Sequence, residues 1–250
     1  MSFRTSVIAA LIGCAFGCDR APASPCAPLT HGDIPYIVCT FDAAADDIRL
    51  FLNADDGDPY AHFEPLAEAV EEGGERLVFA MNAGMYLPDR RPVGLFVEDS
   101  ETRAPLNLAD GDSNFTLKPN GVFWTGGSQA GVIESEAYAI GDLQPSFATQ
   151  SGPLLVIDGA LHPAFNADGP SRFRRNGVGV MSDGRTVHFV ISEIPVNFHT
   201  FASLFRDRLD TPNALYFDGR ISLIYAPNLT RLERGLAMGP IVGVVEPREN

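Results

Sequence analysis

The sequence predicts an α+β fold, a single domain in which an extended, mostly antiparallel β-sheet system carries two or three packed helices. Short runs of β-branched and aromatic residues recur along the chain and outnumber the helical patterns. The 24 glycines and 19 prolines favour many turns between short strands. A chain of 250 residues, 45% of them hydrophobic, can bury a substantial core.

The N-terminal residues have the pattern of an export signal. Arg4 precedes the apolar run Val7–Phe16, which is too short to span a bilayer as a stable helix. Either Cys18 or Cys14 is then the lipidated first residue of a bacterial lipoprotein, and a plain secreted protein is the alternative. We therefore expect a periplasmic or cell-envelope protein that meets the membrane only through a lipid anchor.

These features divide the chain into a signal peptide over residues 1–18, a flexible tether over 19–30 and a folded domain over 31–250. The tether is rich in proline and alanine and has little to bury. Beyond it no repeat or linker interrupts the chain. Cys26 and Cys39 remain in the exported protein, and an oxidising compartment predicts that they form a disulfide.

The first elements of the domain follow from local patterns. Tyr36–Phe41 and Ile48–Leu52 are β-branched and aromatic runs around an acidic turn, which suits a hairpin. Pro65–Glu72 places its apolar residues on one face and ends at Gly73-Gly74, as a short helix does. The fully apolar run Leu77–Met81 predicts a central strand.

Further apolar runs predict the remaining strands: Val93–Glu98, Gly121–Thr125, Pro153–Ile157, Gly177–Met181, Val187–Ser192, Ala214–Phe217, Ile221–Tyr225 and Ile241–Val245. Asn197 is a good N-cap for one more helix. The helix's buried stripe follows the i, i+3, i+4 and i+7 pattern through Phe198, Phe201, Ala202, Phe205 and Leu209. Those rings are core residues rather than a cofactor site.

The charge of the chain excludes one class of partner and suggests another. A net charge of −14 leaves no broad basic surface for nucleic acid. Arg172, Arg174 and Arg175 nevertheless lie close together, which suggests a local pocket for an oxygen-rich, anionic ligand. The five histidines lack zinc-site spacing, and no nucleotide-binding loop or serine elbow occurs. We therefore expect no metal and no cofactor.

Two polar motifs border apolar strands. Thr149, Gln150 and Ser151 precede the run Pro153–Ile157 and form an uncharged hydrogen-bonding cluster, although turn chemistry alone also explains the stretch. Asn82–Tyr86 (NAGMY) follows the strand Leu77–Met81, where a rigid strand end positions polar groups. Gly84 in this motif permits close backbone approach, and an ordinary turn is the alternative.

Three further residues are candidates for the same site. In Lys118–Val122 (KPNGV) the Asn-Gly pair favours a hairpin, with Asn120 facing a ligand as the alternative. Asp218, followed by Gly219, ends a predicted strand and can act as nucleophile, base or ligand, or can simply form a turn to Ile221–Tyr225. Glu193 ends another strand, and the two carboxylates form a glycosidase-like pair if they face one cleft.

In their order along the chain, these motifs resemble the phosphodiester glycosidase family. The resemblance rests on NAGMY with the following PVGL, KPNGVF, ATQSGPLLVIDG, RRNGVGV and NALYFDGRIS, between Val78 and Ser222. It implies a mixed α/β domain that removes a sugar from a sugar-1-phosphodiester and releases the phosphomonoester. The expected partner is therefore a carbohydrate phosphodiester.

The resemblance also implies roles for individual residues. Matched positions are Asn82 in the early turn, Arg175 and Gly179 at a strand entry, and Asp218, Gly219 and Ser222 in the late turn. Two positions depart from the pattern: Ala83 replaces a glycine after Asn82, and Arg220 replaces a glycine after Gly219.

The chemistry assigns a task to each candidate. Arg175, with Asn176 beside it, is expected to hold the phosphate because guanidinium is a bidentate, permanently charged fork. Asp218, with Glu193 second, is expected to act at the anomeric carbon. A non-catalytic envelope lipoprotein that binds glycans or cell-wall phosphates is the alternative function. A phosphodiesterase that cuts the P–O bond is a weaker one.

Overall fold

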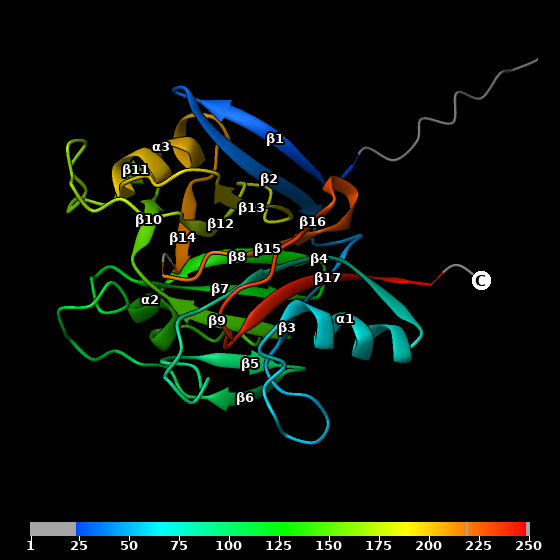
Figure 1. Ribbon diagram of the computed structural model, residues 1–250. Helices are drawn as coiled ribbons and strands as arrows, with labels where there is room; N and C mark the ends of the chain where they lie inside the picture. The colour runs from blue at the N-terminus through cyan, green and yellow to red at the C-terminus, as the bar shows by residue number, and fades with distance from the viewer. Residues whose placement is uncertain (1–23, 219, 249–250) are drawn as a thin grey trace, which may run out of the picture.

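The computed structural model describes residues 24–218 and 220–248 (Figure 1). Its helices are α1 (Phe63–Glu72), α2 (Ser135–Ile140) and α3 (Phe198–Asp207), with a 3₁₀ turn, η1, at Pro227–Leu229. The predicted signal peptide, residues 1–18, and the first part of the predicted tether lie outside the described residues.

The strands form three sheets. The seven-stranded sheet has the order β1 (Cys26–His31), β2 (Ile34–Asp42), β13 (Thr186–Ser192), β12 (Asn176–Val180), β14 (Asn213–Asp218), β10 (Leu154–Ile157) and β11 (Ala160–Leu161). The β4 sheet has the order β16 (Arg231–Leu232), β15 (Ile224–Ala226), β4 (Glu75–Asn82), β17 (Ile241–Pro247) and β3 (Asp47–Phe51). The β7 sheet has the order β6 (Glu101–Ala104), β5 (Phe96–Glu98), β9 (Phe147–Ser151), β7 (Gly121–Gly126) and β8 (Gln129–Glu134).

Neighbouring strands in all three sheets run antiparallel, for example β12 beside β13 and β4 beside β17. This arrangement with three helices confirms the predicted single α+β domain. The apolar run at residues 77–81 is indeed central, because β4 is the third of five strands.

An aromatic core joins the three sheets. Phe189 of β13 stacks on Phe79 of β4, with ring centroids 5.0 Å apart, and meets Phe123 of β7 edge-on at 5.7 Å. Each ring comes from a different sheet and is at most 1% exposed. Because aromatic side chains bury large apolar areas, this contact holds the sheets in one body.

Two helices cover outer sheet faces, as Figure 1 shows. On α3 the predicted residues Phe201, Ala202 and Phe205 are buried against the seven-stranded sheet, and Leu204 joins them. The Asn197 side chain accepts a 2.8 Å hydrogen bond from the Thr200 N–H, which confirms the predicted N-cap. The α1 helix buries its apolar face against the β4 sheet.

The expected hairpin between the runs at residues 36–41 and 48–52 is wrong. Strand β2 lies between β1 and β13, whereas β3 pairs with β17 in another sheet. The acidic turn after Asp42 therefore carries the chain from one sheet to the next. Local patterns identified both strands but contain no information on their distant partners.

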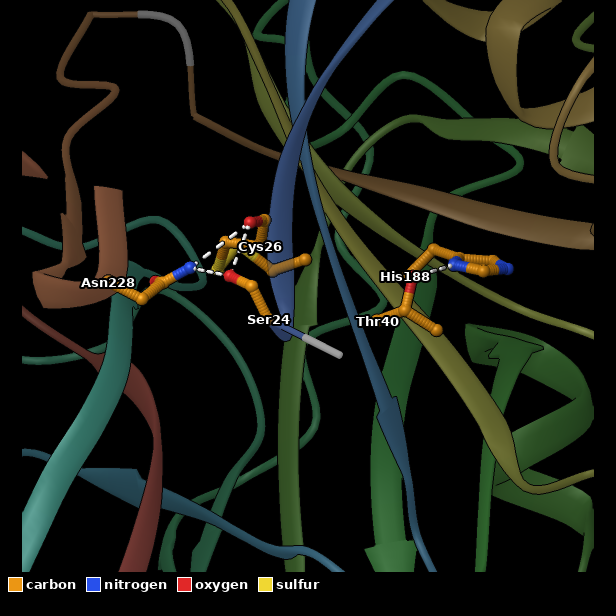
Figure 2. Close-up of a disulfide and its surroundings, with 6 residues drawn as sticks. Ser24, Cys26, Thr40, His188 and Asn228 are labelled. Carbon is orange, nitrogen blue, oxygen red and sulfur yellow. Dashed lines mark hydrogen bonds between the residues drawn. A yellow bond between two sulfur atoms is a disulfide. The ribbon is translucent and has the colours of Figure 1, made fainter. Parts of the chain in front are cut away.

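The expected flexible tether over residues 19–30 is also wrong where the structure describes it. Residues 26–30 belong to β1, an edge strand that pairs with β2 and places Cys26 opposite Cys39. These two cysteines form the disulfide that the sequence predicts. In Figure 2, the Asn228 side chain donates hydrogen bonds to the Ser24 hydroxyl and to the Cys26 carbonyl. Covalent and polar contacts thus order a segment with few apolar residues of its own.

In the part of the chain that the structure describes, no helix has the length and apolar character needed to cross a membrane.

Candidate functional site

Ends of strands from all three sheets converge at one place. Asn82 ends β4, Ser151 ends β9, Asp218 ends β14 and Asn176 begins β12. Asn176 lies opposite Asp218 in the seven-stranded sheet, and the Ser151 hydroxyl donates a 2.8 Å hydrogen bond to the Phe217 carbonyl. Segments up to 136 residues apart in sequence thus meet here.

A pair of buried asparagines ties two of the sheets together. The Asn176 side-chain amide donates to the Asn82 carbonyl at 2.7 Å and to the Asn82 Oδ1 at 3.1 Å. Asn82 Oδ1 also accepts from the Leu223 N–H at 2.9 Å. Both side chains are at most 1% exposed. Their polar groups are therefore used within the protein, beneath the surface of the site.

The same network holds the backbone around Asp218. Asn176 Oδ1 accepts a 3.2 Å hydrogen bond from the Asp218 N–H, and the Ser222 hydroxyl lies 2.8 Å from the Asp218 carbonyl. Asp218 Oδ1 in turn accepts from the Arg220 N–H at 2.8 Å. Since both ends of the residue are anchored, the carboxylate has a defined position. Gly219, another predicted site residue, lies outside the described residues.

A cavity of about 590 Å³ opens beside Asp218. Asp218 and Arg220 line it together with Tyr86 and Arg90 from the segment after β4 and Phe115 from the segment before β7. Small-molecule sites usually occupy roughly 300–1,000 Å³, so the cavity is large enough for a sugar phosphate. Among the predicted catalytic and substrate-binding residues that the structure describes, Asp218 is the one that lines it.

Gln150 does not line the cavity, and its side chain is committed to hydrogen bonds within the protein. Its Nε2 donates to the Asn107 carbonyl at 2.8 Å, and its Oε1 accepts from the Leu95 and Asn107 N–H groups at 3.0 and 2.9 Å. A 1% exposed glutamine with these bonds positions backbone rather than ligand. Thr149, also 1% exposed, packs beside Gly84, where a Cβ atom would lie 2.5 Å from the Gln150 carbonyl oxygen. Gly84 thus lets the NAGMY turn pack on β9.

Asn120 has a similar supporting role. The hairpin expected at residues 118–122 is wrong, because β7 pairs with β8 and β9 rather than with a strand before this turn. The Asn120 amide donates a 2.7 Å hydrogen bond to the Phe115 carbonyl, and Asn120 is 1% exposed. It therefore holds Phe115, which lines the cavity, in place.

The Asp-Gly sequence after β14 is likewise not a hairpin turn. Strand β14 belongs to the seven-stranded sheet and β15 to the β4 sheet, so the chain changes sheets after Asp218. The second strand also begins at Ile224, three residues later than the predicted Ile221.

Arg175 is fully buried, away from the lining of this cavity. Its Nε donates to the Val196 carbonyl at 2.9 Å and one terminal nitrogen donates to the Ser171 carbonyl at 3.1 Å. The guanidinium lies 3.6 Å from the centre of the Phe198 ring, an attractive cation–π contact. Burial lowers the pKa of Arg175, and interaction with Tyr216 partly opposes that effect. These contacts fix the segments around it rather than face the Asp218 cavity.

Glu193 belongs to a network of ion pairs. Its carboxylate accepts hydrogen bonds from Arg231 at 2.8 and 3.0 Å and from Arg174 at 3.3 Å. Glu233 joins the same two arginines, at 2.7 Å to each. Burial disfavours the charge of Glu233, but the arginine hydrogen bonds outweigh it and lower its pKa. Glu193 and Asp218 therefore do not form the expected carboxylate pair lining one cavity.

Within residues 24–218 and 220–248, no group of three or more His, Cys, Asp or Glu side chains is placed to hold a metal ion.

Sequence reasoning missed several residues that line the cavity, including Tyr86, Arg90, Phe115 and Leu236. The sequence did contain a signal for Tyr86, which lies inside the NAGMY motif. It also contained one for Arg220, another lining residue, because Arg220 departs from the family pattern. Leu236 follows no motif, and its position depends on the loop between β16 and β17.

The chain is similar to several known proteins. The pattern of the phosphodiester glycosidase family matches residues 75–225. A curated relative is the uncharacterized protein YigE of Escherichia coli (strain K12), which is 31% identical over 186 residues, or 74% of this chain and 72% of the relative. The region that matches the family, residues 75–225, contains all four converging strand ends.

Solved structures also share the fold, among them two that match 88% of this chain. One is a hypothetical protein from Synechocystis, with a TM-score of 0.57 and 14% identity, in a match over 88% of this chain and 61% of that one. This chain therefore spans less than two thirds of that protein. The other is the catalytic domain of zebrafish N-acetylglucosamine-1-phosphodiester α-N-acetylglucosaminidase, auto-inhibited by its pro-peptide. Its TM-score is 0.60 and its identity 11%, over 88% of this chain and 81% of that one.

Proposed function

The chain belongs to the phosphodiester glycosidase family and is a hydrolase-like enzyme, and we propose that it removes a sugar from a sugar-1-phosphodiester. The bond that breaks joins the anomeric carbon to the phosphate oxygen. Water supplies the hydroxyl group of the released sugar. The remaining proton of that water passes to the released phosphomonoester or to solvent. The observation that carries this proposal is the placement of Asp218 at a cavity of sugar-phosphate size, at the end of a rigid strand.

Asp218 supplies negative charge where positive charge develops. Cleavage at an anomeric carbon passes through an oxocarbenium-like state, which a fixed carboxylate stabilises or which water attacks with the carboxylate as base. The hydrogen bonds from the Asp218 and Arg220 N–H groups hold this residue before substrate arrives. Such preorganised charge is worth roughly 10²–10³ in rate for one group.

Arg90 and Arg220 supply the positive charge for the phosphate. Both line the cavity with Asp218, and guanidinium binds phosphate oxygens as a two-pronged donor. Arg175, the arginine favoured by sequence, instead supports this site through Tyr216, the residue two before Asp218. We therefore assign Arg175 a positioning role.

The leaving group explains why one carboxylate suffices at the cavity. A phosphomonoester departs as a stabilised anion, so protonation by a second carboxylic acid is less important than in glycosidases that release an alcohol. Glu193 is committed to Arg174 and Arg231 and does not line the cavity. A leaving group that needs little protonation is therefore compatible with a cavity that Glu193 does not line.

Hydrolysis in oxygen-18 water tests the proposal. The substrates are methyl phosphodiesters at the anomeric position of N-acetylglucosamine, glucose, galactose and mannose, and mass spectrometry follows both products. We expect label in the sugar and none in methyl phosphate. Label in the phosphate would identify P–O cleavage, and no turnover of any substrate would favour the non-catalytic binding protein.

We propose further that the protein is exported, either as a lipoprotein anchored through Cys18 or Cys14 or in secreted form. The export-type pattern before residue 19 supports this proposal, and so does the Cys26–Cys39 disulfide, since such bonds persist in oxidising compartments. Cell fractionation with mass spectrometry of the mature N-terminus tests it. An intact N-terminus on cytoplasmic protein would contradict it.

A further inference from the structure

The cavity beside Asp218 is lined chiefly by apolar side chains. Its polar lining residues are Asp218, Arg90, Arg220, Tyr86 and Ser113. Its larger apolar residues include Met85, Leu87, Phe115, Ile221 and Leu236. Most of the lining therefore offers apolar contact rather than hydrogen bonds.

We propose that the substrate is a sugar-1-phosphodiester whose leaving group carries an aliphatic chain, and that this chain occupies the apolar part of the cavity. This inference rests on the proposed function and names the substrate class of the same site. Asp218 then faces the anomeric carbon, Arg90 and Arg220 face the phosphate, and the chain extends away from them.

The apolar part of the cavity is unsuited to the sugar ring. A hydroxyl group that is buried without a hydrogen-bond partner is destabilising, and a hexose has several. The Tyr86 hydroxyl already donates to the Ala237 carbonyl at 3.1 Å. The Ser113 hydroxyl lies 3.1 Å from that of Thr116 and accepts from the Thr116 N–H. Few uncommitted polar groups therefore remain there for sugar hydroxyls.

The lining favours a flexible chain over an aromatic leaving group. Arg90 covers the Tyr86 ring at 5.4 Å, and Gly239 packs so closely behind the ring that a Cβ atom would lie 2.5 Å from Tyr86 Cγ. Phe115 is the other ring in the described lining, and the remaining apolar residues there are aliphatic or proline. Because Phe115 is only 2% exposed, neither ring of the described lining offers an open face of the kind that stacks on a planar group.

Two leucines extend the apolar lining to the protein surface. Leu87 is 39% exposed and Leu236 is 68% exposed, although both line the cavity. Exposed apolar side chains that continue a cavity mark binding surfaces. A chain longer than the cavity would cover them and gain the same hydrophobic stabilisation.

A series of substrates with one sugar and different leaving groups tests the inference. The leaving groups are methyl, butyl and hexyl phosphate, with glycerol and phenyl phosphate as polar and aromatic comparisons, all below their aggregation concentrations. Burial of a methylene group contributes about 0.8 kcal/mol, so kcat/KM is expected to rise about threefold or more per methylene. From methyl to hexyl, five methylenes, the rise is about 240-fold or more.

Two variants assign the effect to the cavity. Leu236→Asn is expected to reduce the hexyl-to-methyl ratio at least about threefold, the contribution of a buried methylene. Ile140→Asn is the matched control, because Ile140 is 90% exposed on α2 and does not line the cavity. It should leave the ratio unchanged.

The outcomes separate this inference from the proposed function. Equal turnover of the methyl, hexyl and glycerol esters overturns the inference of an aliphatic leaving group and leaves the glycosidase function in place. A preference for the phenyl ester has the same two consequences. A chain-length effect that Leu236→Asn does not reduce also overturns it. If no ester in the series is hydrolysed, both this inference and the proposed function are overturned.

Discussion

At the scale of single residues, most predicted site residues form a buried support for the one that reaches the cavity. Asn82, Asn176, Gln150 and Ser151 are each at most 1% exposed and bond to protein atoms. The sequence identified them because polar residues at strand ends are unusual in an apolar core. The sequence did not distinguish residues that line the cavity from residues that hold them in position.

Replacement of Asn176 tests this supporting role. Asn176→Ala removes the hydrogen bonds to the buried Asn82 carbonyl and from the Asp218 N–H. We expect a loss of about 1–3 kcal/mol in the free energy of unfolding, the cost of leaving a buried carbonyl such as that of Asn82 unsatisfied. Urea denaturation measures it. Exposed Asn166→Ala is the control, and equal stability of the two variants would contradict the support model.

At the scale of elements, the sequence predicts strands well and their pairing poorly. The runs at residues 77–81, 121–125 and 187–192 form strands, because a buried antiparallel strand has a local signature. The pairing of β3 with β17 joins segments from opposite ends of the domain, and no local sequence signature specifies it. Strand β1 was missed because the Cys26–Cys39 disulfide and pairing with β2 stabilise it more than its own composition does.

The disulfide is therefore expected to contribute strongly to stability. It closes a loop between residues 13 positions apart, and loss of a native disulfide costs roughly 2–5 kcal/mol. The Cys26→Ser, Cys39→Ser double variant should unfold at lower urea, and hydrogen exchange in β1 should rise first. Wild type under reductant should match the variant. An unchanged urea midpoint would show that strand pairing alone holds β1.

At the scale of the whole molecule, buried histidines couple stability to pH. Burial lowers the pKa of His188 below its ordinary value of 6.5, with Asp183 partly opposing, and burial likewise lowers the pKa of His162. The folded protein therefore binds protons less readily than the unfolded chain. Its stability is constant above the unfolded pKa and falls as the pH drops from about 6.5 towards the folded values.

This linkage predicts a loss of stability between pH 7 and pH 5. Urea denaturation at several pH values measures the free energy of unfolding. His188→Gln should reduce the slope, because glutamine does not titrate, while exposed-loop variants should retain it. A wild-type stability that is flat between pH 7 and pH 5 would contradict the linkage.

The whole fold also shows where sequence reasoning ends. Periodicity and turn residues are local, and they predicted the α+β class. The cavity forms where the segment after β4, the loop before β7 and the chain after β14 meet, and no local pattern specifies that meeting. This is why Asp218 was found in advance while Arg90 and Leu236 were not.

The most direct test compares two carboxylates in one assay. Turnover of a sugar-1-phosphodiester is measured for Asp218→Asn and Glu193→Gln, with Asp33→Asn in the exposed β1–β2 turn as control and circular dichroism as the check on folding. The account predicts a loss of roughly 10²–10³ in kcat for Asp218→Asn and changes within a few-fold for the other two. Retained activity in a folded Asp218→Asn protein would contradict it.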